Sequence, residues 1–167
     1  MAHAGSTGED GLGLLCEALS RLPMGEVLVV LIGAVSESKR EAIQIALRRR
    51  AGGMVHFLEP SAAEQERLLQ AADFVLVPGA LEPGCVFFRS AQRAGIVPVV
   101  EQSAGLHELV RDFDPVTGEG NGVVFYRHSV EALIDAMLRA AQLPSATKSL
   151  LEERNRARDF SWASTAK

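Results

Sequence analysis

Two short apolar segments, FVLV at residues 74–77 and IVPVV at residues 96–100, constrain the fold of this chain most strongly. Each is continuously apolar rather than alternating, and the turn-forming pair Pro78-Gly79 follows the first segment. Short continuous runs rich in β-branched residues are typical of strands that are covered on both faces. The chain between them leads into a helix that ends near Gly95, so the sequence predicts two parallel strands joined by a helical crossover.

Strands and helices alternate along the rest of the chain as well. Further strands are predicted from apolar runs at residues 27–32, 54–58 and 122–125. Helices are predicted from apolar spacing, capping residues and terminal glycines at residues 11–22, 37–51, 61–72, 103–111, 129–143 and 147–159. This order predicts an α/β fold, a Rossmann-like parallel sheet with helices on both faces.

The length and composition indicate one domain. The 167 residues, of which 47% are apolar, are enough for a single hydrophobic core. Residues 1–10 are small and polar and are predicted to be a flexible N-terminus. Residues 11–146 are predicted to form the domain, and residues 147–167 a C-terminal helix and tail.

Composition argues against several classes of partner. The net charge of −4 gives no basic face for nucleic acid. No apolar run approaches the ~20 residues of a membrane helix, so no membrane partner is expected. The two cysteines are expected to be free thiols in a reducing compartment, the cytoplasm or, in a eukaryote, a plastid. Metal-binding, Rossmann-fingerprint and P-loop motifs are absent, so neither a metal nor a cofactor is expected.

Glu82 is the strongest candidate for a binding residue. It follows the predicted strand at 74–77 and precedes a helix, and parallel sheets bind ligands beyond the carboxyl ends of their strands. A carboxylate there can accept hydrogen bonds from sugar hydroxyls, while Gly84 and the amides after it can cradle a phosphate. The alternative, a solvated loop carboxylate with no ligand, remains open on these observations alone.

Residues 73–110 resemble the C-terminal lobe of bacterial glycogen synthases and plant or algal starch synthases. The segment VPGALEPGCV at 77–86 is similar to that family's Ser-Arg-Phe-Glu-Pro-Cys-Gly-Leu motif. GIVPVV at 95–100 and SAGLHELV at 103–110 resemble the motifs Gly-x-x-Pro-x-Val and Thr-Gly-Gly-Leu-x-Asp-x-Val that follow it. The likeness continues through residues 112–125 and ends with DFSW at 159–162.

The resemblance implies a function and a set of site residues. The family transfers glucose from ADP-glucose to the non-reducing end of an α-1,4-glucan, with retention, in a cleft between two Rossmann-like lobes. By resemblance, residues 11–146 form the lobe that binds the nucleotide sugar, and residues 147–167 cross back to the other lobe. The implied substrate-binding residues are Glu82 for the donor glucose, Gly84, Cys85, Val86 and Phe87 at the helix start, and Ser103 and Gly105 in the next loop.

The chain also departs from the family pattern. Asp10 stands at the position of a lysine that clamps the donor diphosphate, and Ala80 replaces the motif arginine. Phe87 replaces a threonine, and Ala104 replaces one of two glycines. The N-terminal lobe has no counterpart here, so no catalytic residue is assigned, and this chain alone is expected to be inactive or weak. Two hypotheses follow: a donor lobe that works with an N-terminal synthase lobe, or a non-catalytic scaffold or regulatory module that contacts another protein or α-glucan.

Overall fold

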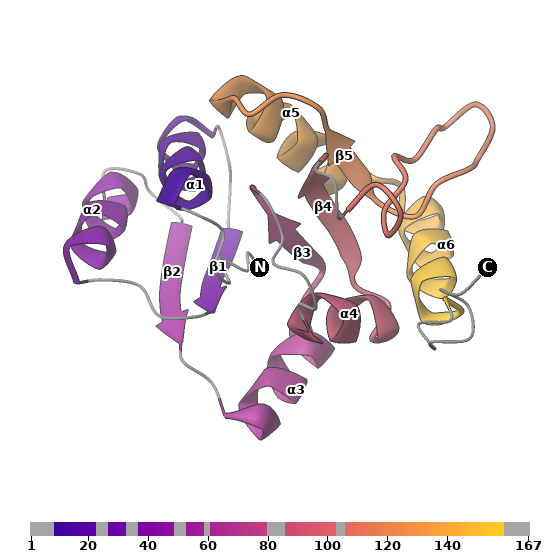
Figure 1. The fold of residues 1–167 in the computed structure, drawn as a ribbon, viewed down its shortest axis with the longest axis horizontal. Coiled ribbons are helices and arrows are strands. Elements are labelled where there is room, and N and C mark those ends of the chain that lie inside the picture. The colour runs from indigo at the N-terminus through magenta and orange to yellow at the C-terminus, as the bar shows by residue number, and fades with distance from the viewer. Residues whose placement is uncertain are drawn as a thin grey trace.

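The computed structural model describes residues 9–22, 27–32, 37–48, 53–58, 61–79, 86–102 and 106–158, which contain six helices and five strands (Figure 1). The elements are α1 (Glu9–Arg21), β1 (Val27–Ile32), α2 (Glu37–Arg48), β2 (Gly53–Leu58), α3 (Ala62–Ala71), β3 (Phe74–Val77), α4 (Val86–Arg93), β4 (Val97–Glu101), β5 (Val123–Phe125), α5 (Val130–Ala141) and α6 (Ser145–Arg156). Helices and strands alternate as far as β4, after which β5 and then α5 and α6 follow. The predicted α/β class is therefore confirmed.

All strand pairs are parallel, as predicted, but their hydrogen bonds form two groups. β1 pairs with β2, with Val27 opposite Gly53, and β4 lies between β3 and β5. A single ladder across all five strands is not present in the described residues. Side-chain packing joins the two groups instead, because Val29 of β1 and Leu76 of β3 belong to one buried cluster.

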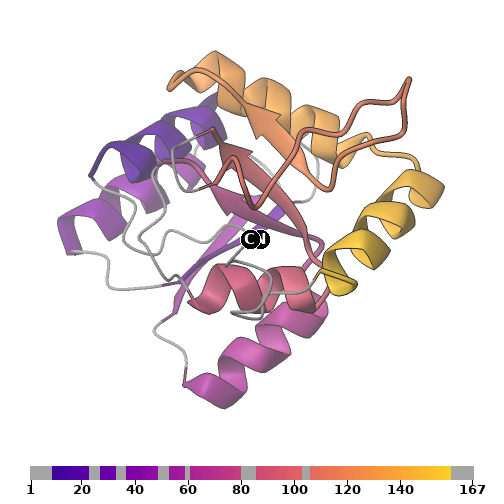
Figure 2. The same cartoon turned by 45° about the vertical axis from the view of Figure 1, so that its right-hand side comes forward.

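The strands of the three-stranded group are buried on both faces, which explains their continuous apolar sequences. Leu76 faces a cluster formed with α1 and α5, whereas Val75 and Val77 face a second cluster formed with α4. Successive residues of a strand point to opposite faces, so a strand between two helical layers has no solvent-facing position. Figure 2 shows α1 and α5 on one side of these strands and α3 and α4 on the other.

Two predicted helix starts are confirmed by their capping contacts. At α3, the Ser61 amide donates to Glu64 Oε2 at 2.8 Å, which completes a capping box. The Ser61 hydroxyl and amide together lower the pKa of the exposed Glu64 carboxyl. At α5, the Ser129 hydroxyl accepts a hydrogen bond from the Ala132 amide at 3.2 Å.

The helix predicted at 103–111 does not form in its described part. Residues 106–109 make a single turn, closed by the Val110 amide donating to the Leu106 carbonyl at 2.8 Å. Burial of both Leu106 and Val110 anchors the two ends of this turn. The Leu109 carbonyl bonds to side chains from distant segments, such as Gln92 Nε2 at 3.2 Å, so it is committed to tertiary contacts.

The termini differ modestly from expectation. α1 begins at Glu9, inside the segment predicted to be flexible, and residues 1–8 lie outside the described residues. α6 packs on this domain through Leu151 and Asn155, both with 0% exposure. Residues 159–167 lie outside the described residues, so their crossing to another lobe stays a prediction.

Candidate functional site

The candidate site is the edge at which β3, β4 and β5 end. Because the three strands are parallel, their last residues, Val77, Glu101 and Phe125, mark one edge of the sheet. α4 begins at Val86, after the connection that leaves β3. The first amides of a helix have no partner within the helix, so they are available to a ligand at such an edge.

Of the seven predicted binding residues, the structure describes Val86 and Phe87. Val86 is 75% exposed at the start of α4, whereas Phe87 is half-buried and packs against the α4 core cluster. Phe87 therefore packs the start of α4 against the core, whereas the Val86 side chain faces solvent. Glu82, Gly84, Cys85, Ser103 and Gly105 lie outside the described residues, so their roles stay predictions.

A polar contact between His128 and Glu101 at the same edge was not anticipated from the sequence. His128 Nδ1 lies 2.8 Å from Glu101 Oε2, although 27 residues separate them. The Glu101 side chain is 15% exposed, so its carboxylate sits in a largely enclosed position at the end of β4. Beside it, the Gln102 amide donates to the Phe125 carbonyl at 2.9 Å and extends the pairing of β4 with β5. The position of Glu101 directly after an apolar run was the only sequence signal.

Tyr126, the residue after β5, adds an exposed ring to this part of the chain. It is 67% exposed and follows the buried Phe125. An aromatic ring with a phenolic hydroxyl can stack on a planar ligand and also form a hydrogen bond. Together with Glu101 and His128, Tyr126 gives the carboxyl ends of β4 and β5 both polar and aromatic groups.

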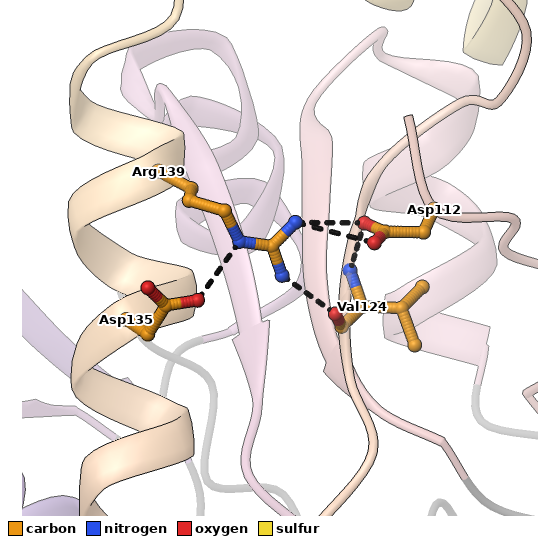
Figure 3. Close-up of polar contacts among 4 residues, drawn as sticks. All are labelled: Asp112, Val124, Asp135 and Arg139. Carbon is orange, nitrogen blue, oxygen red and sulfur yellow. Dashed lines mark hydrogen bonds and ion pairs between the residues drawn. The ribbon is translucent and has the colours of Figure 1, made fainter. Parts of the chain in front are cut away.

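A cluster around Arg139 fixes the position of β5 (Figure 3). Arg139 Nη2 donates to the Val124 carbonyl at 2.7 Å, and Nη1 lies 3.2 Å from both carboxylate oxygens of Asp112. The Val124 amide donates to Asp112 Oδ1 at 2.8 Å. The side chains of Asp112 and Arg139 thus bond to the amide and the carbonyl of Val124 on the edge of β5 away from β4. A neighbouring strand would otherwise provide these two hydrogen bonds. This cluster therefore fixes β5 close to its carboxyl end, which Tyr126 directly follows.

A pocket of about 880 Å³ lies at the opposite end of the strands. Its lining includes Asp73 and Ile96, which directly precede β3 and β4, and charged residues of α6 such as Lys148. Lys148 Nζ lies 2.5 Å from Asp73 Oδ1, so opposite charges in the lining neutralise each other. Parallel sheets bind ligands at the carboxyl ends, so we assign the candidate site to that edge and not to this pocket.

Neither a metal centre nor a membrane span is found in the described part of the chain. No three or more His, Cys, Asp or Glu side chains among those residues are grouped to hold a metal ion. None of the described helices has the length and apolar character needed to cross a bilayer.

A domain of parallel strands with helices on both faces defines the Rossmann-like class of α/β folds. A family model described as "Glycosyl transferases group 1" matches residues 7–159. The chain belongs to this family of glycosyltransferases.

Curated relatives and a solved structure agree with this assignment. A glycogen synthase of Desulfitobacterium hafniense is 27% identical over 161 residues, which are 95% of this chain and 34% of that protein. A glycogen synthase of Anaeromyxobacter sp. is 32% identical over 163 residues, again 95% of this chain and 34% of the relative. The chain thus spans about one third of the length of the curated relatives it matches.

The solved structure is the catalytic domain of starch synthase IV from Arabidopsis thaliana, bound to ADP and acarbose. It superposes with a TM-score of 0.75 at 23% identity, covering 99% of this chain and 35% of that chain. The fold is therefore that of one lobe of a GT-B glycosyltransferase. The likeness to the C-terminal lobe of glycogen and starch synthases, predicted from the motifs, is confirmed.

Proposed function

We propose that this chain is the nucleotide-sugar lobe of a glycogen or starch synthase-like glycosyltransferase, with ADP-glucose as its donor. The observation that carries the proposal is the shared edge of β3, β4 and β5, with α4 beginning beside it, in a chain matched by the family model over 7–159. Residues 11–146 make up this lobe in the proposal. The reaction of the complete enzyme would be glucosyl transfer to an α-1,4-glucan.

Each predicted site residue has a physical role in this proposal. Glu82 accepts hydrogen bonds from the donor glucose, since charge-assisted bonds to sugar hydroxyls are strong and directional. The amides of Gly84, Cys85, Val86 and Phe87 face the phosphates at the positive end of the α4 dipole. Ser103 and Gly105 line the donor from the loop after β4. The 75% exposure of Val86 supports an accessible helix start.

The proposal also includes weak or absent turnover by this chain alone. Asp10 is the second residue of α1 and stands where the family's motif has a diphosphate-clamping lysine. A negative charge there repels the negative charge that develops on the diphosphate leaving group, whereas a lysine would stabilise it. One lobe, moreover, does not orient donor and acceptor together. An N-terminal synthase lobe, or a chain carrying one, is the partner that the proposal requires.

Asp10 and Ala80 also favour a second candidate function, a non-catalytic module. In that alternative the lobe contacts a glucan-synthesising enzyme or an α-glucan and has lost donor binding along with the clamp. The two candidates differ in one observable property, which is binding of the donor to the isolated chain.

Calorimetric titration with ADP-glucose separates the two candidates. The donor-lobe proposal predicts saturable binding that Glu82→Gln weakens by about 10- to 100-fold, because hydrogen bonds to a charged group contribute ~1.5–3 kcal/mol. Glu41→Gln, a matched change on the exposed surface of α2, is expected to leave the affinity unchanged. No heat of binding from a folded wild-type chain would refute the donor lobe and leave the non-catalytic module.

A further inference from the structure

The pocket at the amino ends of β3 and β4 lies outside the proposed donor site. Residues of α3, α4 and α6 contribute to its lining, and Figures 1 and 2 show α3 and α6 both beside α4. Its volume of about 880 Å³ falls within the range of small-molecule sites, ~300–1,000 Å³. The pocket is therefore large enough for a ligand of its own.

One part of the lining is a row of alternating charges along α6. Lys148, Glu152 and Arg156 are spaced four residues apart, so they lie on one face of the helix. Lys148 Nζ lies 4.0 Å from Glu152 Oε1, and Arg156 Nη2 lies 3.6 Å from Glu152 Oε2. The row thus brings both hydrogen-bond donors and acceptors to the pocket.

Both ends of this row are fixed to the rest of the domain. Lys148 Nζ lies 2.5 Å from Asp73 Oδ1, directly before β3, and Arg156 Nε donates to the Ala94 carbonyl at 3.3 Å, directly after α4. The second contact requires a glycine at position 95, because a Cβ added to Gly95 would lie 2.5 Å from Arg156 Nε. Side chains that are already held in place lose less conformational freedom when a ligand binds.

The charges of the pocket indicate which ligands it can bind. Its described lining contains equal numbers of acidic and basic side chains, which are Glu66, Asp73 and Glu152 against Arg93, Lys148 and Arg156. An anion would meet the carboxylates and a cation the basic groups, so neither gains a net charge attraction. An apolar ligand would remove water from the ion pairs without replacing its hydrogen bonds. A neutral ligand rich in hydroxyl groups fits best, because a hydroxyl donates to carboxylates and accepts from ammonium and guanidinium groups.

The uncharged part of the lining also suits such a ligand. Gln65 and Gln70 of α3 and Ser90 of α4 add amide and hydroxyl groups, which both donate and accept hydrogen bonds. Leu69 and Ile96 add apolar area between these polar groups. A sugar ring has hydroxyls around its rim and C–H groups on its faces, so a lining of this mixed kind matches a carbohydrate.

We propose that this pocket is a second ligand site of the lobe, for a neutral oligosaccharide, and that its natural ligand is a segment of the α-1,4-glucan. The choice of this glucan rests on the proposed function, in which the complete enzyme extends that polymer. A polymer is long enough to contact the lobe at more than one place, and linked contacts raise the effective concentration of the rest of the polymer. The pocket thus holds the glucan at the end of the strands opposite the donor site.

The test is a titration of the isotopically labelled 167-residue chain with maltopentaose, followed by amide chemical shifts. We expect saturable shifts at Asp73, Ile96 and Lys148. Glu152→Gln should weaken this binding about tenfold, because it removes a charged acceptor from the pocket and the partner that holds Lys148 and Arg156.

Glu153→Gln is the matched control for this substitution. Glu153 is the exposed neighbour of Glu152 on α6 and is not among the residues that line the pocket, so the variant should keep the wild-type affinity. Asp73→Asn is a second test variant on a different element. The Asp73 side chain is 68% exposed, so its replacement should leave the fold intact and still weaken maltopentaose binding. Thermal unfolding of each variant checks that it is folded.

Charged ligands test the charge argument in the same measurement. Inorganic phosphate and ADP-glucose should leave the amides of Asp73, Ile96 and Lys148 unshifted, because the basic groups of the pocket are balanced by carboxylates. Shifts of these amides by phosphate would show an anion site and overturn the inference.

Three results with maltopentaose would also overturn it. The first is an absence of shifts at millimolar maltopentaose, and the second is shifts confined to the carboxyl edge, at Val86 and Tyr126. The third is an equal loss of affinity in Glu152→Gln and Glu153→Gln. Donor binding is measured separately, with ADP-glucose at the carboxyl edge. Failure of the donor proposal is therefore distinguishable from failure of this one.

Discussion

Arg139 Nη1 lies 3.2 Å from both carboxylate oxygens of Asp112, although the two residues are 27 positions apart in the chain. Together they bond the amide and the carbonyl of Val124, so they complete the outer edge of β5 (Figure 3). The pair is half-buried, with 39% and 26% of the side chains exposed. It is therefore more than a surface ion pair, because it also satisfies backbone groups that would otherwise be unpaired.

Replacing Arg139 should destabilise the domain. Arg139→Gln leaves the Asp112 carboxylate without its charged partner and the Val124 carbonyl without its donor. We expect the free energy of unfolding to fall by about 1–3 kcal/mol in urea titrations. Arg89→Gln, on the exposed surface of α4, should stay within about 0.5 kcal/mol of the wild type. Equal effects of the two substitutions would refute the role given to Arg139.

Gly122 should not accept a side chain. It is buried, and an added Cβ would lie 2.7 Å from Pro98 Cγ and from the Pro98 carbonyl oxygen, and 2.8 Å from Val110 Cγ1. Gly122→Ala is therefore expected to cost about 1–3 kcal/mol, as overpacking typically does.

Gly13 offers the opposite case within α1. It is exposed, and a Cβ added there would meet no heavy atom within 4 Å. Gly13→Ala should stabilise the domain by about 0.5–1 kcal/mol through helix propensity. Thermal unfolding of the two variants should thus shift in opposite directions, and a gain in melting temperature for Gly122→Ala would contradict the observed packing.

The capping box at α3 predicts a pH-dependent contribution to stability. The Ser61 hydroxyl and amide lower the pKa of Glu64 below its usual value of 4.5. A carboxyl whose pKa is depressed on folding binds its proton more readily in the unfolded chain, so its contribution is present above pH 4.5 and is lost as the pH falls through the folded pKa. Urea titrations between pH 3 and pH 7 should show this loss in the wild type, a smaller loss in Ser61→Ala and none from this group in Glu64→Gln. Ser145→Ala, at the start of α6, should leave the wild-type pH dependence in place, and a Ser61→Ala profile identical to that of the wild type would contradict the capping role.

Local signals in the sequence predicted the scaffold well. The run at 74–77 defined β3 with its observed bounds, and Ser61 and Ser129 marked the starts of α3 and α5. These features depend on residues close in sequence, on apolar runs and on side chains that bond to the backbone two or three residues away. The motif resemblance likewise led to the family to which the chain belongs.

Long-range contacts account for what was missed. The predicted helix at 103–111 failed in its described part because the Leu109 carbonyl bonds to Gln92, Asn121 and Arg158. The pairing of Glu101 with His128 joins two strand ends that only the folded sheet brings together. No local pattern specifies such partners, since each contact depends on register and helix docking. Glu82 and the residues next to it lie outside the described residues, so their arrangement stays a prediction.

Binding of a nucleotide sugar at the carboxyl edge of β3, β4 and β5 is the central functional proposal for this chain. Amide chemical shifts of the isotopically labelled chain, recorded during titration with ADP-glucose, report on that edge residue by residue. We expect saturable shifts at Val86, Glu101 and Tyr126, with Asp73 and Lys148 at the opposite end of the strands unchanged. Shifts confined to the pocket that Asp73 and Lys148 line, or no shifts at millimolar ADP-glucose, would contradict binding at this edge.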